Sequence, residues 1–106
     1  MKYRDLSPAE GQDAPAADPQ LVVLDVRTPP EFVQHRIDGA LLLPIQELAA
    51  RAHELDPQRR YLVICEHGVR SRMACEYLSG RGFQALVNLN GGMANWLGAG
   101  LPVARG

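Results

Sequence analysis

The sequence predicts an α/β fold with a central, mostly parallel sheet flanked by helices. Short apolar runs, typical of strands covered on both faces, alternate with segments whose apolar residues recur at helical spacing. The length of 106 residues and the 46% hydrophobic content suit one domain spanning residues 1–106. In sheets of this kind, functional sites lie at the carboxyl ends of the strands.

The N-terminal part of the chain contains a helix start signal. Ser7 can cap a helix that Pro8 begins, and Glu10 completes a capping box with Ser7. We expect Gly11 to stop this helix and residues 13–19 to form a surface loop.

The remaining elements follow from apolar patterning and turn signals. The expected strands are residues 21–26, 40–43, 62–64 and 85–89. The expected helices are residues 28–33, residues 45–55, a helix that Ser71 caps, and a helix that carries Trp96 after a Gly-Gly turn.

The chemistry-bearing residues lie between the strand at residues 62–64 and the helix after it. Cys65 comes at the carboxyl end of the strand, and Gly68 permits the tight turn that follows. The positive end of the helix and the nearby Arg70 both favour thiolate over thiol, which predicts an activated nucleophile. A loop of inward-pointing backbone N–H groups would also hold an anionic substrate on the sulfur.

The loop and three further stretches resemble the rhodanese family. Residues 65–71, Cys-Glu-His-Gly-Val-Arg-Ser, are similar to its active-site loop, and residues 24–32, 37–44 and 91–96 are similar to its other signatures in order and spacing. The chain departs from the family's pattern at His35-Arg36, where Gly-His is common, and it carries Glu66 at a variable loop position.

The resemblance implies a fold and an activity. It implies a single rhodanese-like domain and a sulfurtransferase that moves sulfane sulfur from a donor such as thiosulfate, through a persulfide on Cys65, to cyanide or a protein thiol. It implies catalytic roles for Cys65 and Arg70 and needs no cofactor. The expected substrate-binding loop residues are Glu66, His67, Gly68, Val69 and Ser71. Asp25 and Arg27 are expected to support the loops around the site as a structural buttress.

Two other functions stay open at this point. The same fold is shared with dual-specificity phosphatases, whose Cys-x5-Arg loop is one residue longer than the stretch from Cys65 to Arg70. The chain could also be a sulfur-carrying or regulatory module without turnover, although it keeps both residues, whereas inactive relatives usually lack the nucleophile.

Composition narrows the set of partners. A net charge of −1 with 11 basic and 12 acidic residues indicates neither nucleic acid nor an anionic membrane as a partner. We expect a small sulfur-containing anion as donor, a protein or small-molecule thiol as acceptor, a monomer, and a cytoplasmic location where thiols stay reduced.

The remaining cysteine and the histidines carry no separate prediction of a site. Cys75 is expected to be a small core residue on the helix after the loop. No metal site is predicted, because the histidines and cysteines lack the spacing of metal ligands.

Overall fold

A parallel β-sheet runs through the centre of the molecule, whose computed structural model describes residues 3–106. Within that range the elements are β1 (Arg4–Leu6), α1 (Pro8–Ala17), β2 (Val22–Asp25), α2 (Pro29–Gln34), β3 (Leu41–Leu42), α3 (Ile45–Arg51), the 3-10 helix η1 (Ala52–Glu54), β4 (Arg60–Ile64), α4 (Val69–Ser79), β5 (Ala85–Leu89) and α5 (Gly92–Gly98). The strands lie in the order β1-β5-β4-β2-β3, and every pairing between neighbours is parallel. The predicted fold class is therefore confirmed.

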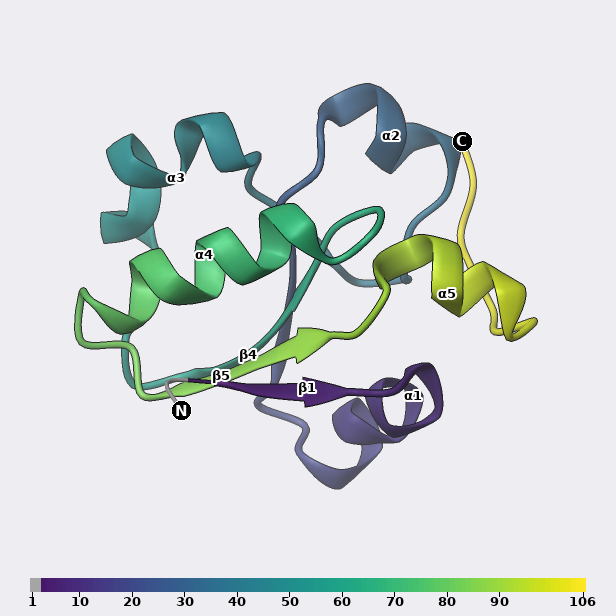
Figure 1. Ribbon diagram of the computed structural model, residues 1–106, viewed down its shortest axis with the longest axis horizontal. Coiled ribbons are helices and arrows are strands. Elements are labelled where there is room, and N and C mark those ends of the chain that lie inside the picture. Colours follow the sequence, from purple (N-terminus) through teal and green to yellow (C-terminus); the bar gives the residue numbers. More distant parts are fainter. Residues whose placement is uncertain (1–2) are drawn as a thin grey trace.

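Helices cover both faces of the sheet. Side chains of β4 alternate between the two faces, as successive residues of a strand must. Tyr61 and Val63 pack in the core cluster that includes α3 and α4, whereas Leu62 and Ile64 pack in the cluster that includes α5 and borders α1. Figure 1 shows α3 and α4 on one side of the sheet and α1 on the other. Cys65 continues the alternation and belongs to the cluster on the α4 side.

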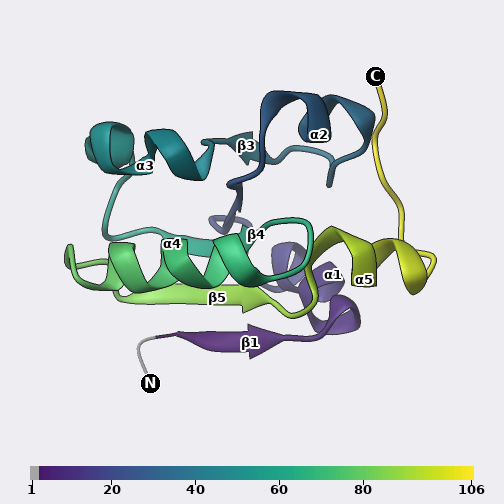
Figure 2. The same cartoon turned by 45° about the horizontal axis from the view of Figure 1, so that its top comes forward.

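The connection from β4 to α4 lies where several segments meet. In both ribbon views it lies between α2 and the start of α5 (Figure 1 and Figure 2). Because β4 is the middle strand of the order, its carboxyl end is flanked by the ends of β2 and β5. Side chains from widely separated parts of the chain can therefore reach one loop.

The first helix is longer than the sequence pattern predicts. The capping box is confirmed, since Ser7 Oγ accepts from Glu10 N–H and Glu10 Oε1 accepts from Ser7 N–H. The expectation that Gly11 ends this helix was wrong, because α1 continues to Ala17 and occupies most of the expected loop. Gly11 is buried, and a Cβ there would lie 3.0 Å from Leu89 Cδ1, so the glycine lets the helix approach the sheet closely.

A fifth strand precedes that helix and was not predicted. β1 pairs with β5, with Leu6 opposite Leu89. Only Leu6 of its three residues is buried, and the segment Arg-Asp-Leu has no apolar run or alternation long enough to predict a strand. Pairing with the edge of β5 decides its conformation.

The other expected elements are present with shifted ends. β3 keeps only two of the four expected residues, and the helix expected at residues 45–55 becomes α3 followed by η1. The strand predicted at residues 85–89 is confirmed as β5. None of the helices within residues 3–106 is long and apolar enough to cross a membrane.

Candidate active site

Cys65 follows β4 directly and has 1% of its surface exposed. The backbone N–H of Gly68 donates to Cys65 Sγ at an N···S distance of 3.0 Å. Gly68 adopts a φ of 94°, in the left-handed region that favours glycine. The predicted requirement for glycine at this turn is therefore confirmed, and the chain reverses around the sulfur within three residues.

Ser71 lies inside the first turn of α4 and not at the cap position that the sequence predicted. The expectation that Ser71 caps the helix was wrong, because α4 begins at Val69 with Gly68 as its cap residue. The N–H of Arg72 bonds the carbonyl oxygen of Gly68 at 3.3 Å, which already places Ser71 inside the first turn. Ser71 is fully buried and its Oγ accepts a hydrogen bond from the Cys65 thiol at 3.3 Å.

The other loop side chains face different surroundings. His67 and Val69 are exposed, so neither packs into the protein around the sulfur. Glu66 is partly buried, and its Oε1 accepts a hydrogen bond from Arg27 Nη1 at 3.2 Å. Of these three side chains, only Glu66 joins the loop to the connection between β2 and α2, where Arg27 lies.

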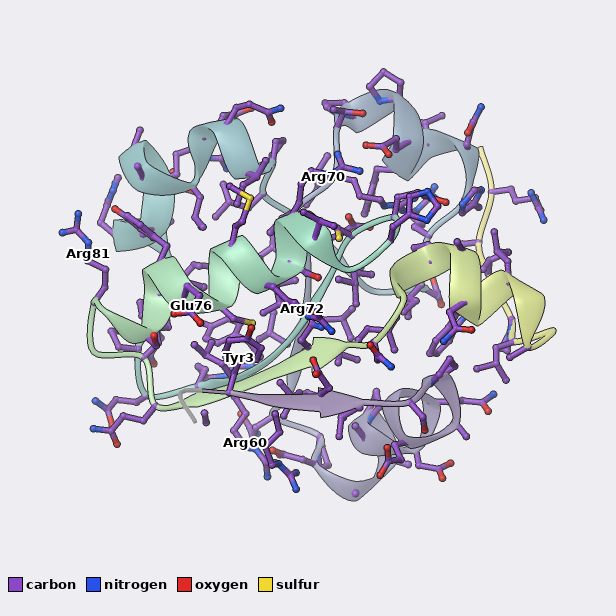
Figure 3. The ribbon with its side chains drawn as sticks, in the orientation of Figure 1. Tyr3, Arg60, Arg70, Arg72, Glu76 and Arg81 are labelled. Carbon is purple, nitrogen blue, oxygen red and sulfur yellow. The ribbon has the colours of Figure 1, made fainter. Side chains whose placement is uncertain are left out.

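Arg70 forms a two-pronged ion pair with Glu31 of α2. Its two terminal nitrogens donate to the two carboxylate oxygens, each at 2.8 Å. The hydrogen bonds from Arg70 are the main reason that the pKa of Glu31 falls from 4.5 to about 2, and those to Glu31 raise the pKa of Arg70. The negative charge of a Cys65 thiolate and of Glu66 would raise the pKa of Arg70 further, so the guanidinium lies within electrostatic reach of both. Figure 3 shows Arg70 at the first turn of α4, on the side that faces α2.

Glu31 was not among the predicted site residues. The sequence pattern places it in the first turn of a helix after Thr28, and Glu31 Oε1 does accept hydrogen bonds from the Thr28 N–H and hydroxyl, both at 3.0 Å. The same carboxylate also holds Arg70, which lies 39 residues further along the chain. A local capping pattern gives no sign of this second partner.

Asp25 and Arg27 lie beneath the loop and are both completely buried. Arg27 Nη2 donates to Asp25 Oδ2 at 2.8 Å and to the carbonyl oxygen of His35 at 2.7 Å, while Nη1 reaches Glu66. Burial by itself would lower the pKa of Arg27, but the hydrogen bonds and charges of Asp25 and Glu66 outweigh it and raise the pKa. Arg27 therefore stays charged and connects three segments around the loop.

The Gly91-Gly92 turn holds the backbone of the loop. The N–H groups of Met93 and Ala94 donate to the carbonyl oxygens of Cys65 and Glu66, at 2.8 and 3.0 Å. A Cβ on Gly92 would collide with both of those carbonyl oxygens, and Gly92 has a φ of 64°. The start of α5 can therefore lie against the loop only where a glycine stands.

Two further predicted residues lie in the core. Cys75 is confirmed as a core residue, and burial raises the pKa of its thiol to about 12. Trp96 packs in the cluster on the face of the sheet away from Cys65, and its Nε1–H donates to the carbonyl oxygen of Pro102 at 2.9 Å.

Within residues 3–106, no three His, Cys, Asp or Glu side chains gather in a way that could hold a metal ion. The arrangement offers instead a sulfur that accepts a backbone N–H, flanked by ion-paired side chains. Such a site suits nucleophilic attack by the sulfur of Cys65.

Comparison with known proteins gives concordant matches. The model of the rhodanese-like domain family matches residues 7–99. A sulfurtransferase of Allochromatium vinosum is 40% identical over 83 residues, which cover 78% of each chain. The thiosulfate sulfurtransferase GlpE of Shewanella oneidensis is 35% identical over 74 residues, or 70% of this chain and 73% of that protein. The crystal structure of a rhodanese-related protein from Thermoplasma volcanium superposes with a TM-score of 0.85 at 35% identity, covering 96% of this chain and 98% of the other.

Proposed function

This chain belongs to the rhodanese-like domain family, and we propose that it is a sulfurtransferase in which Cys65 carries the transferred sulfur as a persulfide. The observation that carries the proposal is the hydrogen bond from Gly68 N–H to Cys65 Sγ at the start of α4. A backbone donor and a helix N-terminus stabilise negative charge on a sulfur placed there. The names of the relatives from Allochromatium vinosum and Shewanella oneidensis support the same class of reaction.

In the first step, the thiolate of Cys65 attacks the outer sulfur of a donor such as thiosulfate. A new bond forms between Sγ and that sulfur, the S–S bond of the donor breaks, and sulfite leaves with the bonding electron pair. In the second step, an acceptor such as cyanide or a thiolate attacks the outer sulfur of the persulfide. The Sγ–S bond breaks, its electron pair returns to Cys65, and no outside oxidant or reductant is needed.

The surrounding residues have distinct tasks in this proposal. Gly68 N–H stabilises the negative charge on Sγ before the first transfer and again after the second, and Ser71 Oγ offers a second polar contact to Sγ. Arg70 places a positive charge beside the loop, and Glu31 fixes its position. Arg27 and Asp25 hold the loop from below as positioning residues.

Donor, acceptor and setting belong to the same proposal. The donor is a small sulfur compound, and the acceptor is a protein or small-molecule thiol, with cyanide as a convenient acceptor in the assay. The protein acts as a monomer. Its setting is cytoplasmic, because a thiolate nucleophile works best where thiols stay reduced.

Intact-protein mass spectrometry after incubation with thiosulfate tests the proposal. We expect the parent protein and the Cys75→Ser variant to gain the mass of one sulfur atom, and the Cys65→Ser variant to gain none. Addition of cyanide should remove the sulfur and release thiocyanate. Gain of sulfur by Cys65→Ser as readily as by the parent would overturn the proposal.

The phosphatase alternative has weaker support in the geometry. The stretch from Cys65 to Arg70 holds six residues, so its ring of N–H groups is smaller than a Cys-x5-Arg loop. The acidic residue inside the loop, Glu66, is bound to the buried Arg27, and Glu31 is bound to Arg70. Neither carboxyl is placed as a protonated acid for a leaving alcohol.

A further inference from the structure

The charged side chains around the Cys65 loop form two ion-paired groups. Arg27 is paired with Asp25 and Glu66, and Arg70 is paired with Glu31. We call these five residues the loop charge cluster. It contains two guanidinium groups and three carboxylates, so its net charge is −1.

Both guanidinium groups already bind carboxylates. Arg27 is fully buried, and its Nε, Nη1 and Nη2 all donate to protein oxygens. Both terminal nitrogens of Arg70 donate to Glu31. A sulfonate group entering the site would have to displace Glu31 to take the same two-pronged contact with both terminal nitrogens of Arg70.

Glu66 is the carboxylate nearest to the nucleophile along the chain, since it follows Cys65 directly. Its side chain is 24% exposed, so its carboxylate lies partly at the protein surface. Among residues 3–106, its Oε1 has Arg27 as hydrogen-bond partner, and His35 Nε2 lies 3.8 Å from the same oxygen.

His35 Nε2 adds no cation unless it is protonated. It is buried and has no hydrogen-bond partner within the part of the chain that the structure describes. While His35 is neutral, Arg27 is therefore the cation that pairs with Glu66 in the described part of the chain.

The backbone of the loop acts on the charge of the Cys65 sulfur, whereas the loop charge cluster acts on the charge of the donor. The Gly68 N–H and the start of α4 stabilise a single negative charge on Sγ itself. The loop charge cluster opposes any further negative charge that a donor brings, because like charges repel across a partly exposed site. Thiosulfate brings two negative charges, an alkyl thiosulfonate brings one, and a protonated persulfide brings none.

We propose that Glu66, anchored by Arg27 and flanked by His35, is a specificity-determining residue that directs Cys65 toward sulfur donors of low negative charge, namely alkyl persulfides, and away from thiosulfate. This inference rests on the proposed persulfide chemistry of Cys65. With a persulfide R–S–SH, the Cys65 thiolate bonds to the terminal sulfur, the bond between the two donor sulfurs breaks, and RS⁻ leaves with the electron pair. The proton stays on the transferred sulfur or moves to RS⁻, and no redox partner is required.

Two donors that differ by one charge test the proposal. Thiosulfate and methanethiosulfonate both present a terminal sulfur on a tetrahedral sulfonyl centre, and the rate of transfer to Cys65 is followed by release of sulfite or methanesulfinate. In Glu66→Gln the amide oxygen can still accept from Arg27 while the charge is removed. We expect kcat/KM to rise about 10-fold for thiosulfate and about 3-fold for methanethiosulfonate, on the order expected for one unit charge at a partly exposed site.

A matched variant and a salt series separate charge from structure. Glu47→Gln removes an exposed carboxylate that is paired with Arg51 on α3, and it should leave both donors unchanged. Added salt should speed the reaction of the parent protein with thiosulfate, because salt screens the repulsion between the donor and the site. If the site were instead positively charged and attracted thiosulfate, added salt would slow this reaction. Loss of rate with salt, or an unchanged donor ratio in Glu66→Gln, would refute this inference and leave the proposed function standing. If neither donor loads sulfur onto Cys65, both this inference and the proposed function are refuted.

Discussion

Arg70 and Glu31 face each other through two parallel hydrogen bonds, each 2.8 Å long, which join the start of α4 to α2. Each side chain is 29% exposed, so the pair lies at the edge of the site rather than in the core. A planar guanidinium matches the two oxygens of a carboxylate, which gives the contact directional as well as electrostatic character. The contact fixes the cation beside Cys65 and links the loop to an element from the first third of the chain.

The Arg70–Glu31 pair should stabilise the protein in a pH-dependent way. Because the pKa of Glu31 in the folded protein is lowered from 4.5 to about 2, its contribution to stability is present above about pH 4.5 and is lost as the pH falls toward 2. For this partly exposed pair, we expect Glu31→Gln to lower the free energy of unfolding by about 1 kcal/mol at pH 7. Urea unfolding of the parent protein and of Glu31→Gln at pH 7 and at pH 3 measures this difference in the free energy of unfolding. An equal difference at both pH values would contradict the lowered pKa of Glu31.

Arg70 should matter for transfer beyond its effect on stability. Removing the guanidinium leaves Glu31 without its cationic partner beside an anionic donor, so Arg70→Ala should slow sulfur transfer from thiosulfate by on the order of 10- to 1000-fold. Arg70→Lys should recover part of the rate, because an ammonium keeps the charge but not the planar fork. Steady-state kinetics with the fold checked by circular dichroism would settle this, and a parental rate in the Ala variant would remove Arg70 from the mechanism.

The two cysteines should differ sharply in reactivity toward alkylating reagents. Burial raises the pKa of Cys75 to about 12, so at pH 8 only about 10⁻⁴ of its thiol is ionised. We expect iodoacetamide to modify Cys65 first in the parent protein, and the Cys65→Ser variant to react at least about 100-fold more slowly. Peptide mapping after a short exposure checks this, and early labelling of Cys75 would show that the core opens readily.

Gly92 should be intolerant of a side chain. Alanine there would meet the carbonyl oxygens of Cys65 and Glu66 and would have to adopt a positive φ. We expect Gly92→Ala to destabilise the protein by about 2–4 kcal/mol and to lower sulfur transfer, because the loop must move.

Gly98 in the same helix provides the control for that substitution. A Cβ on Gly98 meets no atom within 4 Å, and the residue lies at the end of α5. Gly98→Ala should therefore be neutral or stabilising by up to about 1 kcal/mol. Equal thermal unfolding curves for the two variants would contradict the role assigned to the Gly91-Gly92 turn.

The six-residue loop should discriminate against phosphate esters. A smaller ring of N–H groups and the absence of an available acid within the loop predict negligible hydrolysis of an aryl phosphate by the parent protein. One residue inserted between Gly68 and Arg70 should weaken sulfur transfer and admit phosphate esters. Robust hydrolysis by the parent that disappears in Cys65→Ser would favour the phosphatase alternative.

The sequence alone was sufficient for the framework of the site. Buried strands of a parallel sheet appear as continuous apolar runs, so the central strand and the position of Cys65 at its end could be predicted from local pattern. The turn at Gly68 could be predicted too, because a left-handed φ strongly favours glycine. These features depend on residues that are neighbours along the chain.

The tertiary structure decided the contacts between distant segments. The pairing of Arg70 with Glu31 and of Arg27 with Glu66 each spans 39 residues, and no local pattern specifies which carboxylate meets which guanidinium. Ser71 turned out to be a buried neighbour of the sulfur rather than a helix cap, because the helix starts as soon as Gly68 allows it. The charge that a donor meets beside Cys65 follows from these pairings, since Coulomb interactions depend on distance in space and not on separation in sequence.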